Sequence, residues 1–254
     1  MSALTFPGFA PRRRAFSLDE KPTTPHAYDD EFEGSVLDPK WIRLSGGTFD
    51  NISSIDPYAS FATGHRTSLS YRKSWYMVQG SSTGGTVLLY QPVILPTDCF
   101  VWARLGFNFR YSAVVGNDTD VELGLWGDLA GVPDGNNRAY VYLNETDTNT
   151  IQVEAGRVTA SVGAATTMLN VGPQSVGTDS LCQAAAYVGI QKLGTTYHFY
   201  AGQPNGNWTI LASQTHAGAL PWLALALTNT SAAAPGNMLM GCDFVRFFAG
   251  RYLP

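Results

Sequence analysis

The chain has 254 residues, of which only 14% are charged, and its formal net charge is −4 at neutral pH. The negative charge argues against a general nucleic-acid binder, and no apolar run reaches the length of a membrane span. The length fits one all-β domain, and the charge is divided unevenly, with +2 on residues 1–28 and −6 on the rest.

Residues 1–28 are predicted to form an extended arm. Four prolines prevent a helix, and no signal peptide is expected because Pro7 and Gly8 interrupt the start and the charges follow it. A basic arm beside an acidic body predicts attraction between neighbouring subunits, and spaced phenylalanines suit apolar pockets of another chain. The predicted docking residues of this arm are Phe6, Phe9, Arg12, Arg13, Arg14 and Phe16.

An acidic cluster opens the body of the chain at Asp29, Asp30 and Glu31. Together with Asp243, these carboxylates could supply oxygen ligands to Ca²⁺, or they could cap turns and pair with arginine. We predict that these carboxylates cap turns and pair with arginine and do not bind Ca²⁺. No metal or cofactor is expected, because the histidines are scattered and the three cysteines lack Cys-x-x-Cys spacing. Unpaired cysteines favour a reducing compartment.

Residues 29–254 are predicted to form one domain of short strands, with a brief helix near residues 178–186. Turn residues lie at 46–47, 84–85, 116–118, 133–135 and 204–206. Alternating or apolar runs predict strands at 86–93, 99–110, 120–128, 138–144, 186–193, 196–202, 208–213, 222–229 and 239–249. Strands spaced in this way are typical of a sandwich or barrel.

Alternation sorts the side chains of these strands into two faces, and it places Phe107, Leu123 and Leu225 in the core. The opposite faces would expose aromatic, arginine and carboxylate side chains on one sheet if the strands are neighbours. Such a mixture suits a sugar site, a protein interface or an ordinary outer face. The residues of this predicted glycan or partner face are Trp102, Arg104, Arg110, Glu122, Trp126, Asp128, Tyr140 and Tyr142.

Five phrases resemble, in order, the concanavalin A-like lectin and glucanase superfamily. The phrases are DDEFEGSVLDPKW at 29–41, LLYQPV at 88–93, AYVGIQKLGTTYHFYAGQPNGNWTILASQ at 186–214, LALALTN at 223–229 and GCDFVRFFAG at 241–250. The resemblance spans residues 29–253. It implies an all-β, two-sheet antiparallel jelly-roll sandwich, with the extended N-terminal arm outside it.

Three carboxylates at alternate positions, Asp118, Asp120 and Glu122, indicate an enzymatic alternative. Retaining glucanases of this superfamily carry a similar Glu-x-Asp-x-Glu arrangement, and carboxyls about 5–5.5 Å apart suit a retaining mechanism. In this chain the first position is the shorter aspartate, which follows the turn residues Gly116 and Asn117. The chain is therefore predicted to have no catalytic residues.

The lead KPTTPHAYDDEFEGSVLDPKW at 21–41 is similar to the start of lectin-fold structural proteins of tailed bacteriophages. That resemblance implies a non-enzymatic virion component in the tail, a fibre or the capsid decoration, assembled in the host cytoplasm. The arm would anchor a homo-oligomer to other virion proteins, and the body would face the host surface. The alternatives are a glycan-binding adhesin or carbohydrate-binding module and, third, a retaining glycoside hydrolase.

Overall fold

The computed structural model describes residues 22–32, 37–47, 53–56, 75–80, 85–110, 119–146, 150–159, 162–173, 181–202, 207–229 and 238–252. Within these residues, all regular structure is β-strand, arranged as two antiparallel sheets. The first sheet has the order β1 (Ile42–Gly47), β4 (Gly85–Pro92), β13 (Trp222–Asn229), β6 (Thr119–Leu129), β7 (Val132–Thr146), β8 (Thr150–Thr159) and β9 (Val162–Pro173). The second has the order β12 (Trp208–Thr215), β11 (Thr196–Gly202), β10 (Leu181–Leu193), β5 (Asp98–Arg110), β14 (Met238–Ala249), β3 (Trp75–Gly80) and β2 (Ser53–Asp56).

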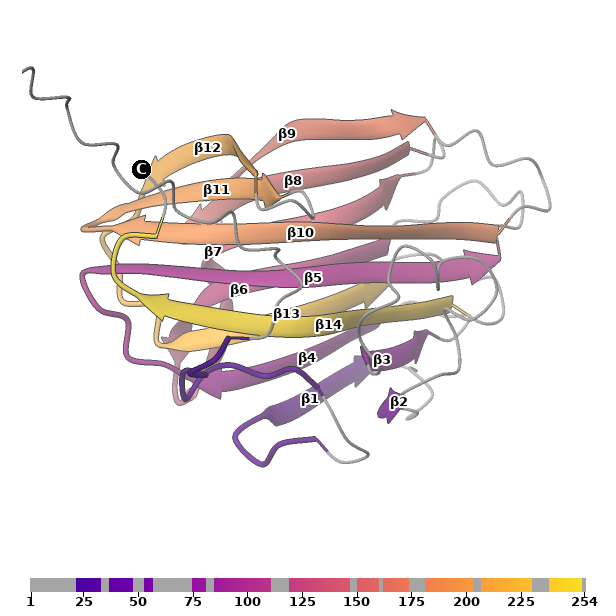
Figure 1. Cartoon of the computed structure of the whole chain (residues 1–254), viewed down its shortest axis with the longest axis horizontal. Helices are drawn as coiled ribbons and strands as arrows, with labels where there is room; N and C mark the ends of the chain where they lie inside the picture. The colour runs from indigo at the N-terminus through magenta and orange to yellow at the C-terminus, as the bar shows by residue number, and fades with distance from the viewer. Residues whose placement is uncertain are drawn as a thin grey trace, which may run out of the picture.

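The two sheets lie face to face as a sandwich. In Figure 1 the long strands β10, β5 and β14 lie in front, and β6, β7 and β13 lie behind them. The predicted two-sheet antiparallel sandwich is thereby confirmed. The first 21 residues, which include all the predicted docking residues of the arm, lie outside the described part of the chain.

Alternation along the strands builds the core between the sheets, because every second side chain points inward. On the first sheet, Leu123 and Leu225 are fully buried, as predicted, whereas the side chain of Phe107 is not described. On the second sheet, Cys99 and Cys242 are buried in the same cluster as free thiols. Burial raises the pKa of Cys99 to about 11 and that of Cys242 well above its ordinary value.

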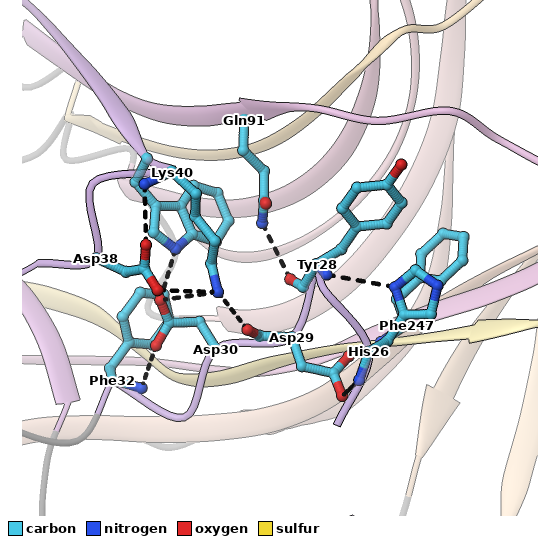
Figure 2. A network of polar contacts seen from close by, with 10 residues as sticks. His26, Tyr28, Asp29, Asp30, Phe32, Asp38, Lys40, Gln91 and Phe247 are labelled. Carbon is cyan, nitrogen blue, oxygen red and sulfur yellow. Dashed lines mark hydrogen bonds and ion pairs between the residues drawn. The ribbon is translucent and has the colours of Figure 1, made fainter. Parts of the chain in front are cut away.

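The start of the described chain pairs with the last strand, β14. Asp30 and Val245 exchange two backbone hydrogen bonds of 2.8 Å. The Asp29 carboxylate accepts a 2.6 Å hydrogen bond from the backbone N–H of Phe247. The His26 ring lies 4.7 Å from the Phe247 ring, and Figure 2 shows both rings beside the Asp29 carboxylate.

The side-chain carboxylate of Asp30 holds the residues that follow it in place. Asp30 accepts 2.7 Å hydrogen bonds from the Phe32 backbone and from Trp41 Nε1, and its Oδ2 lies 3.6 Å from Lys40 Nζ (Figure 2). Lys40 Nζ also donates to the Asp29 carbonyl. These contacts fasten residues 26–32 and 37–41 to β14 as one polar network, which we call the junction.

The other acidic residues of the cluster also form ion pairs. Glu31 contacts Arg246 at 2.8 and 3.3 Å, and Asp243 lies 3.4 Å from Arg104. The prediction that these carboxylates cap turns and pair with arginine is therefore confirmed. The Glu31–Arg246 pair joins the start of the body to β14, and the Asp243–Arg104 pair joins β14 to β5.

Two local predictions are wrong. The brief helix predicted near 178–186 is strand from Leu181 onward, because backbone pairing with β5 outweighs the helix preference of an alanine-rich run. The turn predicted at 133–135 lies inside β7. The chain reverses instead at Ala130 and Gly131, which have φ values of 54° and 87°. Among the described residues, none forms a helix that could span a membrane.

Candidate functional site

The structure divides the predicted glycan or partner face between the two sheets. Glu122, Trp126 and Tyr140 lie on the outer side of the first sheet, whereas Trp102 and Arg104 lie on the outer side of the second. The expectation that one sheet carries them all is wrong, because β5 pairs with β10 and β14 and not with β6. We call the outer side of β13, β6, β7 and β8 the β6–β7 face.

The centre of the β6–β7 face is an interlocked group of three side chains. Trp126 Nε1 donates a 2.8 Å hydrogen bond to Glu122 Oε1, and Arg138 lies 3.0 Å from Glu122 Oε2. The Arg138 guanidinium also covers two rings, at 4.9 Å from Trp126 and 4.5 Å from Tyr140. Register produces this group, because Trp126 pairs with Arg138 across the two strands.

Glu122 is almost fully buried in this group, with 5% of its surface exposed. Burial raises its pKa above the ordinary value, and the nearby Arg138 and the Trp126 hydrogen bond oppose that shift. Gly124 makes the geometry possible, since it stands between the two residues on the same side of β6. A Cβ there would lie 2.6 Å from Trp126 Cδ1 and 2.7 Å from Glu122 Oε1.

A second group of side chains adjoins the first on β7 and β8. Tyr142 stacks on Tyr140 with ring centroids 5.5 Å apart, and its hydroxyl donates to Glu154 Oε2. Burial, and then this hydrogen bond, raise the pKa of Tyr142 far above its usual range. Asn144 follows on the same side of β7, directly opposite Asp120 of β6. The Asn144 side chain is 6% exposed, and its Oδ1 has no hydrogen-bond partner in the described structure.

On β13, and on β4 next to it, the outer side of the sheet carries apolar side chains. Trp222 lies edge-on to Tyr90 at 5.3 Å, and its Nε1 donates a 2.9 Å hydrogen bond to Asp128. Trp222 stands directly opposite Trp126, and Ala224 and Ala226, which follow on the same side of β13, are buried in the same cluster. Asp128 itself is exposed at the end of β6, where it also accepts a hydrogen bond from the backbone of Gly131.

Trp102 and Arg104 take part in a different arrangement on the second sheet. The Trp102 ring stacks on two other rings, with centroid distances of 5.2 Å to Phe100 on the same strand and 5.3 Å to Tyr252, which follows β14. Arg104 is 5% exposed and lies over the Tyr187 ring at 5.0 Å, beside its partner Asp243. These residues cover the outer side of the second sheet together with Tyr252, and they are not part of the β6–β7 face.

Some predicted residues fall outside the described structure. Arg110 ends β5 and pairs with Leu181 through the backbone, but its side chain is not described. Asp118 precedes the described part of β6, so only Asp120 and Glu122 of the three carboxylates can be placed. Both point outward from β6, since Val121 and Leu123 point into the core.

Sequence reasoning missed Arg138, Glu154 and Trp222. Arg138 alternates with Tyr140 and Tyr142, so extending the pattern by one step would have placed it on the same face. Glu154 lies on β8, whose run TIQVEAGRVT is too polar and glycine-interrupted to predict a strand. Its neighbours became apparent only from the pairing of β7 with β8.

No family model matches the chain, and no curated protein is similar to it. Among solved structures, the catalytic domain of an endo-1,3-beta-glucanase (laminarinase) from Thermotoga petrophila aligns with a TM-score of 0.53 and 12% identity, over 89% of this chain and 97% of that one. A variant of the GH43 protein BlXynB from Bacillus licheniformis aligns with a TM-score of 0.51 and 9% identity, over 91% of this chain and 40% of that one.

The chain thus spans less than half of the GH43 protein and nearly all of the laminarinase domain. A legume lectin-like domain from Entamoeba histolytica aligns at a TM-score of 0.44 and 12% identity, over 69% of this chain and 84% of that one, which is too weak to support an argument. At these identities the likeness establishes the fold alone. That fold is a two-sheet antiparallel β-sandwich, and the laminarinase domain and part of the GH43 protein share it.

Proposed function

We propose that the protein binds carbohydrate through the β6–β7 face and does not cleave it. The observation that carries the proposal is the interlocked group of Glu122, Trp126, Arg138 and Tyr140, which holds two aromatic rings and their charged partners in one orientation. Trp126 and Tyr140 are themselves only 7% and 6% exposed and form the fixed base of the face. The partly exposed rings of Trp222 and Tyr142 offer surfaces for the C–H faces of a sugar, and Arg138 can bind its hydroxyls. A site held by its own contacts loses little entropy when a ligand binds.

The row of aromatic side chains supports a ligand longer than one sugar. Trp222, Trp126, Tyr140 and Tyr142 lie on three adjacent strands, β13, β6 and β7. Trp222, Arg138 and Tyr142 are only partly buried, so a ligand can reach them from solvent.

The state of the two carboxylates supports binding without hydrolysis. Glu122 is engaged by Arg138 and Trp126, and Glu154 accepts the hydroxyl of Tyr142. A glycosidase needs one carboxyl as acid and a second as base or nucleophile at the scissile bond. In this protein both carboxylates instead orient neighbouring residues.

The test is a glycan array followed by calorimetric titration of any sugar that binds. Trp222→Ala should weaken binding about tenfold or more, because a ring in contact with a sugar contributes on the order of 1–2 kcal/mol. Trp208→Ala is the matched control, since Trp208 is also partly buried and opens β12, but it packs on Phe100 on the other sheet. The proposal fails if no glycan binds, or if both variants lose binding equally.

A second candidate function, as a virion structural protein anchored by its arm, is favoured by the junction. Residues 26–32 are fixed to β14 by hydrogen bonds and ring contacts, so a preceding arm would start from a defined point on the sandwich. Together with the resemblance of residues 21–41 to phage proteins, this supports a role in attachment to other virion proteins.

Deletion of residues 1–21 tests the attachment role, because it leaves the contacts of His26 and Asp29 in place. The truncated protein should fold with an unchanged melting temperature, and it should no longer join an assembly or self-associate in light scattering. The intact arm with Arg12, Arg13 and Arg14 replaced by alanine should lose less, because exposed charge pairs contribute little. Undiminished assembly of the truncated chain would contradict this role.

A further inference from the structure

The outer side of the first sheet changes from polar to apolar between β6 and β1. Strand register forms three rows across this side of the sheet: Leu44, Leu88, Ala226, Glu122 and Tyr142; Ile42, Tyr90, Ala224, Gly124 and Tyr140; and Pro92, Trp222, Trp126 and Arg138. The charged side chains of these rows all lie on β6 or β7, whereas the members on β1, β4 and β13 are aliphatic or aromatic. We call the outward side chains of β1 and β4, which are Ile42, Leu44, Leu88, Tyr90 and Pro92, the apolar strip. Since Pro92 pairs with Trp222, the apolar strip adjoins the β6–β7 face directly.

The apolar strip has a buried floor and an edge that is open to solvent. Leu88 and Tyr90 are each 6% exposed, whereas Ile42 is 45% exposed and Leu44 is 52% exposed. Pro92 is exposed as well. A single exposed apolar side chain is ordinary, but Ile42 and Leu44 occupy successive outward positions of one strand, so they form one patch with the floor beside them. A patch of this kind marks a surface that another apolar group covers.

The size of the apolar strip indicates an aliphatic chain and not a protein partner. A standard protein interface buries roughly 800 Å² on each partner, far more than Pro92 and the half-exposed side chains of Ile42 and Leu44 provide. The apolar strip is also narrow, since β1 lies only two strand spacings, or about 10 Å, from β13. Thr86 and Thr228, whose hydroxyls lie 3.2 Å apart, end it on one side. Within the apolar strip the Tyr90 hydroxyl is the only polar side-chain group, so the covering group needs few hydrogen bonds.

Trp222 stands at the boundary between the polar and the apolar part of this surface. Its ring contacts Tyr90 edge-on at 5.3 Å on the apolar side, and its Nε1 donates a 2.9 Å hydrogen bond to Asp128 of β6. A ligand that stacks on Trp222 therefore meets Arg138 in one direction along the row and Pro92 in the other. Such a ligand has a polar part and an apolar part.

Building on the proposed carbohydrate site, we propose that the ligand is a glycolipid. Its sugar lies over Trp222 and Arg138, and its aliphatic chain follows the apolar strip past Pro92 toward Ile42 and Leu44. Burial of the chain stabilises the complex in proportion to the apolar area removed from water, and it requires no polar partner. The inference explains why the exposed aliphatic side chains of β1 lie on the same side of the sheet as the candidate sugar site.

The experiment measures whether an aliphatic chain strengthens the binding of a sugar. The probes are the octyl and methyl glycosides of glucose, galactose and mannose, titrated into the full chain by calorimetry below the concentration at which the octyl members form micelles. For each sugar that binds, the octyl member should bind at least about tenfold more tightly, equivalent to about 1.4 kcal/mol. Ile42→Ser combined with Leu44→Ser should remove most of that preference, because both changes replace apolar surface of the strip.

The matched control is Ile210→Ser. Ile210 is 52% exposed, as Leu44 is, but it lies on β12 of the second sheet, so this variant should keep the octyl preference. Loss of the preference in Ile210→Ser to the same degree as in the double variant would mean general adsorption of the chain and would overturn the inference.

The remaining outcomes separate the inference from the proposed function. Equal binding of octyl and methyl members, or binding of array glycans without binding of any octyl glycoside, overturns the inference and leaves the proposed function standing. Silence of both the probes and the glycan array overturns both. A change from dimer to monomer in light scattering of the double variant, with the octyl preference intact, would assign the apolar strip to a second copy of the chain and overturn the inference.

Discussion

Glu122 combines burial with a charge at the centre of the candidate site, and this gives stability a pH dependence. Because burial raises its pKa above the ordinary 4.5, the folded state binds the proton more tightly than the unfolded state does. The stability that Glu122 contributes is therefore greatest at low pH, and it declines as the pH rises above 4.5 through the raised pKa.

Glu122→Gln should remove that decline. We expect the urea midpoint of the wild type to fall relative to that of the variant between about pH 4 and pH 7. The same variant tests the non-enzymatic proposal, since it should leave no hydrolytic activity to lose. Polysaccharide hydrolysis by the wild type that Glu122→Gln abolishes would contradict the proposed binding role, and parallel midpoints would contradict the pH argument.

Gly124 is predicted to be required for the contact between Trp126 and Glu122. A Cβ at this position would approach both side chains within 2.7 Å, so Gly124→Ala should cost about 1–3 kcal/mol in the free energy of unfolding. Adding Trp126→Phe, which removes the indole N–H and shrinks the ring, should recover part of that cost. Urea unfolding of the two single variants and the double variant measures the coupling, and strictly additive costs would show that the two residues do not meet.

At the scale of the element, β6 offers a direct test of which side chains hold the sandwich together. Leu123 is fully buried and Leu129 at the end of the same strand is 60% exposed. Leu123→Ala should destabilise the fold by about 2–5 kcal/mol, whereas Leu129→Ala should stay within about 0.5 kcal/mol of the wild type. Similar urea midpoints for the two variants would contradict the placement of Leu123 in the core.

The junction offers a comparable pair of aspartates. Asp30→Ala removes the acceptor for both the Phe32 backbone and Trp41 Nε1, and should cost about 1–3 kcal/mol because buried donors lose their partner. Asp38 is more exposed and its carboxylate lies 3.5 Å from Lys40, so Asp38→Ala should cost at most about 1 kcal/mol. Thermal melts of both variants decide whether the junction is part of the cooperative fold.

Strands with alternating aromatic residues beside a clear turn were predicted from the sequence, whereas strands without these features were not. The run from Leu193 to Trp208 has a glycine turn and alternating aromatics, and its strands β10, β11 and β12 lie where expected. The strands β8 and β9 were not predicted: the alternation in β8 is short and ends at Gly156, and β9 is rich in threonine, glycine and alanine without alternation. A polar strand of this kind forms because the neighbouring strand provides partners for its backbone hydrogen bonds. A short stretch of sequence does not show which strand that neighbour will be.

At the scale of the whole molecule, the candidate site depended on which strands become neighbours. The hairpin β6–β7 joins consecutive strands, so its shared face with Glu122, Trp126 and Tyr140 could be predicted from alternation. The consecutive strands β5 and β6 belong to different sheets, and Trp102 was therefore assigned to the wrong surface. Strands that are close in sequence can be expected to pair as a hairpin. Where the chain passes from one sheet to the other is decided by the packing of the complete core.

The two buried thiols in the core provide internal reporters of how the sandwich opens. Cys99 lies at the start of β5, while Cys242 lies on β14, across from Leu105 in the middle of β5. Both thiols are buried, so thiol-modifying reagents can react with them only after solvent enters that part of the sheet. In a Cys182→Ser background, equal labelling rates at both thiols would indicate that the edge and the middle of this pairing open together. Faster labelling at one thiol would identify the part of the sheet from which the protein begins to unfold.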